Sequence, residues 1–465
     1  MAMSVTDNNT LTLLNTMDYL SAQQGAIFRR LCTGSKINRG ADDPAGLLAL
    51  QSINCELIGV DAAIRNNQRS DAMLNVADSA LTQLSDLLGQ IQTLVAQSSN
   101  SAGLTANEIA SNQSQIDDAI ASIERIVRTT EFNGRNLLDG SLGINVTGAN
   151  ATYFENVRVY SRDPSAASNA VRVTVNGVAQ RAKAEGLTTT AASQATTIEV
   201  KGRLGTQIID LKADENLSAV VAKINDVTAL TGVYASGTSA GVDLYSKGYG
   251  SAEFVKVSIL SGDTTHFKEL DGAGVDADVT VNGAAASADG NEVYFSQNGL
   301  NLAFRITEAF TAGTTQTFEV DKTGGATFQL GTDATTRYTL GIDSLSPRRL
   351  GGKSAGGFLS DLKSGGAASL AKNPAAAAAI AADAQKQVAT MQGRIGSFQK
   401  YQIEISKNTM AAIKESLTTV KSSIADVDYA QETAALARQD VLMQSVASML
   451  SVASQQSAQR ILSLL

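Results

Sequence analysis

The chain carries few residues that could do chemistry, and their surroundings argue against a catalytic site. Residues 237–241 read Gly-Thr-Ser-Ala-Gly, which matches the G-x-S-x-G pattern of a nucleophile elbow. That motif needs a strand before the serine and a helix after it. Here Val233-Tyr234-Ala235 precedes the motif and Val242-Asp243-Leu244-Tyr245 follows it, so both flanks look like strands. The sequence therefore predicts a glycine-rich hairpin turn that contains Ser239, and no nucleophile.

The other reactive side chains are isolated from one another in the sequence. His266 is the only histidine, which excludes histidine pairs and sites with several histidine ligands; its polar loop predicts a solvated side chain. Cys32 and Cys55 lie in helical patterns, so we expect free thiols and no disulfide framework. Asp42 and Asp43 could touch a cation, but helix capping explains them more simply. We therefore expect no catalytic residue, no metal site and no cofactor.

Composition and charge exclude further classes of protein. Of the 465 residues 43% are apolar, and 37 basic against 45 acidic residues give a net charge of −8 without long runs of one sign. This balance gives no support to nucleic-acid binding. No run approaches the roughly eighteen uncharged apolar residues of a membrane span, so we expect no membrane contact. The polar N-terminus, Met1 to Thr10, predicts no cleaved signal peptide.

The elements that would position any site are long helices at both ends of the chain. Apolar residues repeat at spacings of four and three, as they do in helices that bury a narrow stripe against a partner. In the N-terminal part these positions are Leu13, Met17, Leu20, Ile27 and Leu31, and then Leu74, Ala77, Leu81, Leu84, Leu88, Ile91 and Val95. Between the two runs, Gly40 is expected to end the first helix, with Asp43 as N-cap and Pro44 as first residue of the next. A third stripe, Ile116, Ile120, Ile123 and Val127, ends near the turn signal Phe132-Asn133-Gly134.

The C-terminal end repeats this design. Asn373-Pro374 predicts the start of an alanine-rich helix, and Asp428 the cap of the last one. The predicted apolar stripes are Met410, Ile413, Leu417, Val420, Ile424 and Val427 in one helix, and Leu436, Met443, Val446, Leu450 and Leu464 in the next. Similar stripes would occur in any helical bundle, so they predict architecture and not function.

From about residue 146 to 345 the apolar period changes to two. Val171, Val173 and Val175 alternate with other residues, as do Val255, Val257 and Ile259, and Leu300, Leu302, Phe304 and Ile306. Glycines and Asn-Gly pairs between such runs predict antiparallel strands, with one short helix at 216–225. Val-Thr-Val-Asn-Gly occurs at 173–177 and at 279–283, which leaves open a diverged internal repeat, and the insert could form two subdomains. The predicted fold is α+β: terminal helices paired as a coiled-coil-like bundle, with a β-rich antiparallel insert between them.

Several segments carry a resemblance to bacterial flagellins. The N-terminal ones are Leu31 to Asn38 with Ala41 to Leu47, and Asn66 to Leu94; the C-terminal ones are Gly393 to Gln399, Ile424 to Ala430 and Ile461 to Leu465. Within the insert, 197–235 resembles a module of flagellins and filament-cap proteins, and 323–350 resembles the β-hairpin by which flagellin chains return to the helices. Cysteine is unusual in this family, so Cys32 and Cys55 stay unexplained; we expect no bond between them, because the segment between their helices should carry them apart.

The resemblance implies a domain plan and a mechanism. It implies an inner-core helix at 1–37, outer-core helices at 38–145, a surface insert at 146–322, the return hairpin with the C-terminal outer-core helix at 323–427, and an inner-core helix at 428–465. Such a subunit is exported unfolded by the flagellar type III apparatus, and many copies joined head-to-tail give a helical filament for swimming motility outside the cell. The assembly helices would use Leu13, Met17, Leu20, Ile27, Leu31, Leu81, Leu84, Leu88, Ile413, Leu417, Val420, Ile424, Leu436, Met443, Val446 and Leu450.

The resemblance also implies partners and leaves alternatives. The partners would be other copies of the chain, an export chaperone that binds the C-terminal helix, and hook-associated and filament-cap proteins. In flagellins detected by a vertebrate Toll-like receptor, the segment matching Leu88 to Leu94 carries a central arginine; here that position is Gln90, so we expect at most a weak contact.

A hook–filament junction protein is the structural alternative, and an enzyme displayed on the filament is the catalytic one. Glycines at Gly393 and Gly396 predict a close helix–helix approach.

Overall fold

The computed structural model describes residues 8–98, 103–163, 169–188, 191, 193–238, 241–352 and 355–462. The chain divides into two compact units. The terminal-helix unit holds the residues up to 68, residues 330–332 and the residues from 404 onward; the central unit holds residues 69–329 and 333–403. Ser239 and Leu464, both named in the predictions above, lie outside the described residues.

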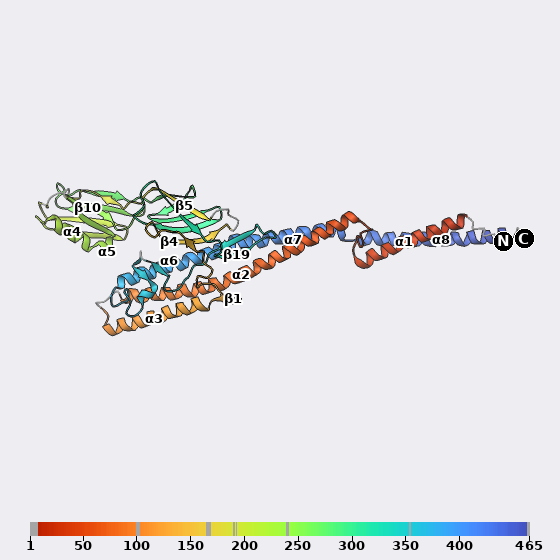
Figure 1. Ribbon diagram of the computed structural model, residues 1–465, viewed down its shortest axis with the longest axis horizontal. Helices are drawn as coiled ribbons and strands as arrows, with labels where there is room; N and C mark the ends of the chain where they lie inside the picture. The colour runs from red at the N-terminus through yellow and green to blue at the C-terminus, as the bar shows by residue number, and fades with distance from the viewer. Residues whose placement is uncertain are drawn as a thin grey trace. The chain divides into compact units, whose positions relative to one another are not determined.

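The terminal-helix unit consists of helices that pair along their length. It contains α1 (Asn8–Thr33), the first part of α2 (Pro44–Ser98), α7 (Glu404–Ala425) and α8 (Tyr429–Leu462). Helices α1 and α8 lie side by side and run in opposite directions (Figure 1), since Leu20 contacts Gln439 while Arg30 contacts Glu432.

Local sequence signals explain most of the helix boundaries in this unit. The Asp43 carboxylate accepts the N–H of Gly46 at 2.9 Å, and Pro44 is the first residue of α2, as predicted. Asp428 accepts the backbone N–H groups of residues 430 and 431 at the start of α8. The prediction that Gly40 ends the first helix is wrong. Helix α1 ends at Thr33, because Gly34 with φ of 68° adopts the left-handed conformation that terminates helices.

Outside the β-rich insert, the helices of the central unit bury apolar side chains. They are α3 (Ala106–Thr129), α6 (Pro374–Phe398), the second part of α2, the 3₁₀ helix η2 (Leu359–Leu362) and the π-helical turn η3 (Gln399–Ile403). Every predicted stripe position of α2 from Leu74 to Val95 is 0% exposed. The stripe of α3 is buried too, and Asn373 caps α6 through the N–H of Ala376. These predictions are therefore confirmed.

Antiparallel strands make up the rest of the central unit (Figure 1). The strands are β1 (Glu131–Phe132), β2 (Arg135–Asn136), β3 (Val146–Thr147), β4 (Phe154–Arg162), β5 (Ala170–Gly177), β6 (Lys183–Ala184), β7 (Thr196–Gly202), β8 (Gly205–Leu211), β9 (Val233–Thr238), β10 (Gly241–Ser246), β11 (Phe254–Ser261), β12 (Leu270–Ala273), β13 (Asp278–Val281), β14 (Ala284–Ala285), β15 (Ser287–Asp289), β16 (Glu292–Gln297), β17 (Leu300–Ile306), β18 (Thr314–Val320), β19 (Ala326–Gln329), β20 (Arg337–Leu340), β21 (Gly351–Gly352) and β22 (Gly357–Phe358).

The β-rich insert contains two separate hydrophobic cores. β module 1, residues 146–177, 278–329 and 333–340, holds the sheets β14-β13-β5-β18-β3 and β15-β16-β17-β4-β20-β19. β module 2, residues 178–277, holds the sheets β6-β10-β9 and β12-β11-β7-β8 with helices α4 (Leu217–Asp226) and α5 (Thr228–Thr231). Strands β19 and β20 form the antiparallel hairpin expected within 323–350.

The repeated pentapeptide Val-Thr-Val-Asn-Gly marks two neighbouring strands of one sheet. Val173 lies opposite Val281 and Val175 lies opposite Val279, so the two copies pair with each other across β5 and β13. Asn282 and Gly283 have φ of 52° and 83° and form a tight turn, whereas the Asn-Gly of the first copy continues its strand. The repeat is therefore a sheet-pairing element and not a second copy of a subdomain.

Substituting a core leucine of α2 tests this arrangement. Leu84→Ala removes a fully buried side chain and should lower the free energy of unfolding by about 2–5 kcal/mol, because the transfer energy is lost and a cavity remains. Leu48, on the same helix, is 74% exposed, so Leu48→Ala is the matched control and should change that energy by about 0.5 kcal/mol or less. Denaturant titration of the monomer measures both. Equal losses would contradict the burial of the α2 stripe.

Candidate assembly interface

Helices α1 and α8 meet along the seam that the heptad pattern predicts. On α1 the predicted positions are partly or fully buried, and on α8 the described ones are partly buried; these are Leu13, Met17, Leu20, Ile27 and Leu31, and Leu436, Met443, Val446 and Leu450. Gln439 falls between these positions on α8 and is only 6% exposed, and its side-chain amide donates to the carbonyl of Leu20 at 2.8 Å. A buried polar group of this kind fixes the register of two helices, because a slip would leave it without a partner.

Polar contacts flank the same seam. The Gln24 amide donates to Asp440 at 2.6 Å, and Arg30 forms an ion pair with Glu432 at 3.1 Å. Both side chains of the ion pair are only partly exposed, so the pair helps to fix the alignment more than an exposed surface pair would.

The segment between α1 and α2 is closed by its own aspartates. Asp42 accepts the backbone N–H of Asn38 and that of Arg39, each at 3.0 Å, and these bonds, that of Asn38 first, hold the pKa of Asp42 below its usual value. Ile37, Leu50 and Ala425 form a small buried cluster beside this segment. The two aspartates thus have local structural partners, so Asp42 closes a loop while Asp43 caps α2.

The stripe of α7 is only partly covered in a single chain. Ile413 is 38% exposed and Val420 is 43% exposed, and Leu417 and Ile424 are partly buried. Among the described residues of α7 only Ala425 is buried. One chain supplies too few partner helices to cover this face, so the use of Ile413, Leu417, Val420 and Ile424 in assembly stays a prediction.

Exposed apolar side chains occur on all four helices of the terminal-helix unit. They are Leu11, Leu14, Tyr19 and Phe28 on α1, Leu47, Leu48 and Ile58 on α2, Ile405, Ile413 and Val420 on α7, and Val441, Leu442, Met449 and Val452 on α8. Its buried apolar residues, by contrast, are Leu20, Ile37, Leu50, Val60, Ala63, Leu330 and Ala425 in the described part of the chain. Exposed apolar side chains in this number on one small unit are what a surface covered by partner molecules would show.

Sequence reasoning missed the exposed residues on α1 and α8. It selected the heptad positions, which pair α1 with α8, and passed over apolar residues on the other faces such as Phe28 and Val441. An excess of apolar residues beyond one stripe was the available signal, since a helix with a single partner needs only one.

The segment Gly393 to Gln399 attaches α6 to β module 1. The guanidinium of Arg394 lies 3.1 Å from the ring centre of Tyr160 on β4 and donates to Asn301 on β17 at 3.2 Å. Burial raises the pKa of the nearby Asp343 carboxyl and lowers that of Arg394. The predicted close helix approach at Gly393 and Gly396 is wrong within the chain, since a Cβ at either position would meet nothing within 4 Å.

The histidine, the G-x-S-x-G segment and the two cysteines do not come together as a catalytic group in the described part of the chain. His266 is not simply solvated: its Nδ1 lies 2.6 Å from Asp263, and that carboxylate also accepts the Ser193 hydroxyl, which therefore does not point to the histidine. Strands β9 and β10 flank the G-x-S-x-G segment and pair with each other, as a hairpin requires. Cys32 and Cys55 are both exposed and free.

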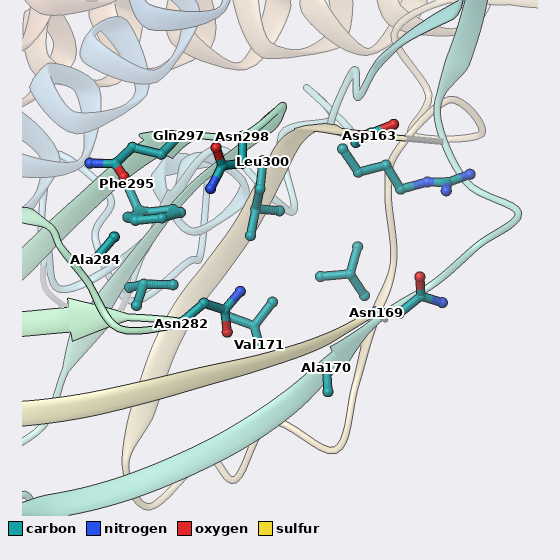
Figure 2. Close-up of a pocket in the computed structure, with 13 residues that line it drawn as sticks. Asp163, Asn169, Ala170, Val171, Asn282, Ala284, Phe295, Gln297, Asn298 and Leu300 are labelled. Carbon is teal, nitrogen blue, oxygen red and sulfur yellow. The ribbon is translucent and has the colours of Figure 1, made fainter. Parts of the chain in front are cut away.

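The open end of β module 1 holds a cavity of about 180 Å³ (Figure 2). Apolar side chains, among them Phe295 and Leu300, form part of its wall, and Asn282 and Asn298 lie at opposite sides. Among the described residues that line it, the charged ones are Arg162 and Asp163, and none is a serine, threonine, cysteine or histidine.

Two further features bear on the expected partners. Leu88 is fully buried in the core of the central unit, so in the segment from Leu88 to Leu94 only Gln90 is exposed at the expected contact positions, with Leu94 partly buried. Helix α2 is long and apolar enough by composition to cross a membrane, with only 17% of the relevant window buried. A single helix of this kind is weak evidence for a membrane span, since core helices and signal sequences pass the same test.

Three regions of the chain match known protein families. Residues 5–142 match the bacterial flagellin N-terminal helical region, residues 378–465 the bacterial flagellin C-terminal helical region, and residues 197–242 the flagellin hook IN motif. Flagellin of Clostridium tyrobutyricum is 24% identical over 95% of this chain and 96% of its own length. Flagellin of Salmonella rubislaw is 27% identical over 99% of both chains. The solved structure of FliC from Burkholderia pseudomallei is 17% identical, covers 71% of this chain and 99% of its own, and has a TM-score of 0.24.

The two helical regions occur at the two ends of the chain in the expected order, and the relatives span nearly all of it. The chain therefore belongs to the bacterial flagellins, as structural subunit of the flagellar filament. The α+β fold and the family expected from the sequence are confirmed. The filament places the protein at the outside of the bacterial cell.

A charge on the exposed face of α7 should separate assembly from folding. Ile413→Asp should lower the free energy of unfolding of the monomer by only about 1 kcal/mol, because the side chain lies at the edge of the covered surface and is 38% exposed. It should block polymerisation, because an unpaired carboxylate would become buried between subunits. Thr317→Asp, at an exposed position of β18, is the control and should still polymerise. Sedimentation of filaments measures the difference; normal filaments from Ile413→Asp would contradict this surface assignment.

Proposed function

We propose that the terminal-helix unit is the polymerising part of the subunit and that the central unit needs no neighbour in order to fold. The observation that carries the proposal is the contrast in burial. The central unit has buried stripes on α2, α3 and α6 and two β cores, whereas the terminal-helix unit buries few apolar residues and exposes others on all four of its helices, such as Phe28 and Val441. Neighbouring copies in a helical array would cover those faces, and repetition of one such contact gives an open filament.

The same exposed stripes suit a subunit that travels unfolded. A paired helix with a small core loses little stability when it is opened, so the terminal helices can fold last, at the growing end. Export by the flagellar type III apparatus requires such a chain, and an export chaperone would bind the apolar face of α8 around Leu442 and Met449. Hook-associated and filament-cap proteins would meet the same helical surfaces at the two ends of the polymer.

The two alternatives have less support. A hook–filament junction protein would share the paired terminal helices, but the segment from Arg394 to Gln399 and the terminal Leu-Ser-Leu-Leu favour the filament subunit. The length of the polymer made by the purified protein separates them, because a junction protein should not grow long fibres. A displayed enzyme would need a cluster of nucleophilic or metal-binding side chains in the insert, and the charged residues among the described lining of the cavity are one pair, Arg162 and Asp163.

Deleting 428–465 should abolish polymerisation and leave the central unit folded. The truncation removes α8, the partner of α1, while every residue of the two β cores remains. Electron microscopy should show no filaments, and circular dichroism should keep the β-sheet signal. Long filaments from the truncated protein would mean that α8 is not needed for assembly; loss of the β signal would mean that the central unit depends on it.

The receptor contact is also testable on the monomer. Gln90 is exposed on α2, where receptor-active relatives of this family are expected to carry an arginine. An arginine supplies a charged, planar fork of donors, and the loss of one central anchor costs about 2 kcal/mol or more, roughly thirtyfold in affinity. We therefore expect weak activation of reporter cells by the unmodified monomer and partial recovery with Gln90→Arg. Gln90→Lys is the control for charge alone, and full activation by the unmodified protein would refute the assignment.

A further inference from the structure

The two β modules are joined at one place by a compact set of backbone contacts. The chain crosses from module 1 to module 2 near Gln180 and returns near Val275. These two residues exchange two hydrogen bonds, from the N–H of each to the carbonyl of the other, at 2.8 and 3.0 Å. A third segment, 247–251, enters the same place, since the N–H of Gly250 donates to Gln180 at 3.2 Å.

Three buried glycines make this joint tight. Gly250, with φ of 111°, and Gly290, with φ of 61°, lie in the left-handed region. A Cβ on Gly250 would come within 2.6 Å of the backbone nitrogen of Gly290, and one on Gly290 within 2.5 Å of the carbonyl of Tyr249. A Cβ on Gly274 would lie 2.3 Å from the carbonyl of Gly250. Three backbone segments, two from module 2 and one from module 1, are therefore in direct contact, which leaves no room for sliding.

One carboxylate connects the modules at this point. Asp276 accepts the backbone N–H of Gly290, in the turn between β15 and β16 of module 1, at 2.7 Å. It also accepts the N–H and the hydroxyl of Ser251, from module 2, at 2.9 and 2.5 Å. The Ser251 hydroxyl and these N–H groups hold the pKa of Asp276 below its usual value, so the group is ionised at neutral pH. Hydrogen bonds to an ionised acceptor are stronger than those between neutral groups.

A second cluster connects the modules at the same joint. Tyr249 belongs to a loop of module 2, yet it packs against the core of module 1, and its hydroxyl donates to Glu308 of module 1. The guanidinium of Arg181 lies 4.4 Å from the ring centre of Tyr249 and 3.7 Å from Glu308. It also lies 5.8 Å from the ring centre of Tyr234, which is on β9 of module 2.

From these contacts we propose that Asp276 is a lock that makes the two β modules one rigid body. Without the Asp276 carboxylate, the N–H groups of Gly290 and Ser251 lose their acceptor. The Arg181–Tyr249–Glu308 cluster and the two connecting segments at Gln180 and Val275 then still join the modules, but as a hinge. The device fixes the direction in which module 2 projects from module 1, so every subunit presents module 2 in the same orientation.

A distance measurement on the full-length monomer tests the lock. Spin labels are placed at Lys256→Cys in module 2 and Thr317→Cys in module 1, both exposed positions, in a Cys32→Ser, Cys55→Ser background. The unsubstituted Asp276 protein should give one narrow distance distribution, and Asp276→Ala should broaden it. Asp276→Asn, which keeps one acceptor oxygen, should fall between them. Asp271→Ala, an exposed aspartate on β12 of the same module, is the matched control and should give the narrow distribution.

Hydrogen exchange at amides that do not bond to Asp276 measures opening of the joint separately from the loss of the Asp276 bonds themselves. The N–H of Gln180 donates to the carbonyl of Val275, and the N–H of Val275 donates to the carbonyl of Gln180. Neither bonds to Asp276, so the exchange of these two amides reports opening of the joint itself. In Asp276→Ala their exchange should speed up roughly tenfold or more, as the loss of hydrogen bonds to a charged acceptor implies. A broad distribution before substitution would overturn the proposal. So would a narrow distribution with unchanged exchange in Asp276→Ala.

Discussion

The apolar surface of the terminal helices exceeds what one chain can cover, and the rest of the molecule is arranged around that excess. Helices α1 and α8 use one stripe each for their own pairing, and the register of that pairing is held by Gln439 and its bond to Leu20. What remains on the other faces stays in water in a single chain. Hydrophobic burial is the main favourable contribution to both folding and association. A chain that leaves apolar surface uncovered on folding therefore gains stability when neighbouring subunits bind and cover it.

Burial within one chain is most complete in the central unit. Its helices and its two β modules enclose apolar cores of their own, and the large apolar side chains that it exposes, such as Leu204, Ile208 and Leu230, lie outside those cores. Arg394 on α6 helps to hold this unit together, because it contacts Tyr160 and Asn301 on strands of module 1. The division between a self-sufficient unit and a dependent unit then follows from where the apolar residues lie.

Much of this architecture could be predicted from local rules, and the failures have specific causes. Periodicity identified the buried stripe from Leu74 to Val95, and capping rules identified Asp43, Asn373 and Asp428. The end of α1 was misplaced because both Gly34 and Gly40 can terminate a helix, and only the backbone conformation distinguishes them. For the α7 stripe, heptad periodicity reports that a face is apolar and cannot report whether the partner belongs to the same chain.

The site itself was only half predictable for the same reason. The seam positions on α1 and α8 follow from spacing, whereas the uncovered faces became visible only when the helices were placed against each other. The contact between Asp276 and Gly290 had no signal in the sequence, since the two residues are brought together by the return of the chain between modules. Long-range polar contacts of this kind depend on topology, which local patterns do not encode.

The pairing of β5 with β13 has a consequence for how such a surface can vary. Gly177 lies opposite Asp278 in the sheet. Module 2 is therefore an insertion whose first and last residues are next to two paired residues of module 1. A domain whose ends are adjacent can be lost, lengthened or exchanged for another with adjacent ends while the host strands keep their pairing. Module 2 is therefore a cassette: its size and surface chemistry can change while the strands that hold it, and the terminal helices, stay the same.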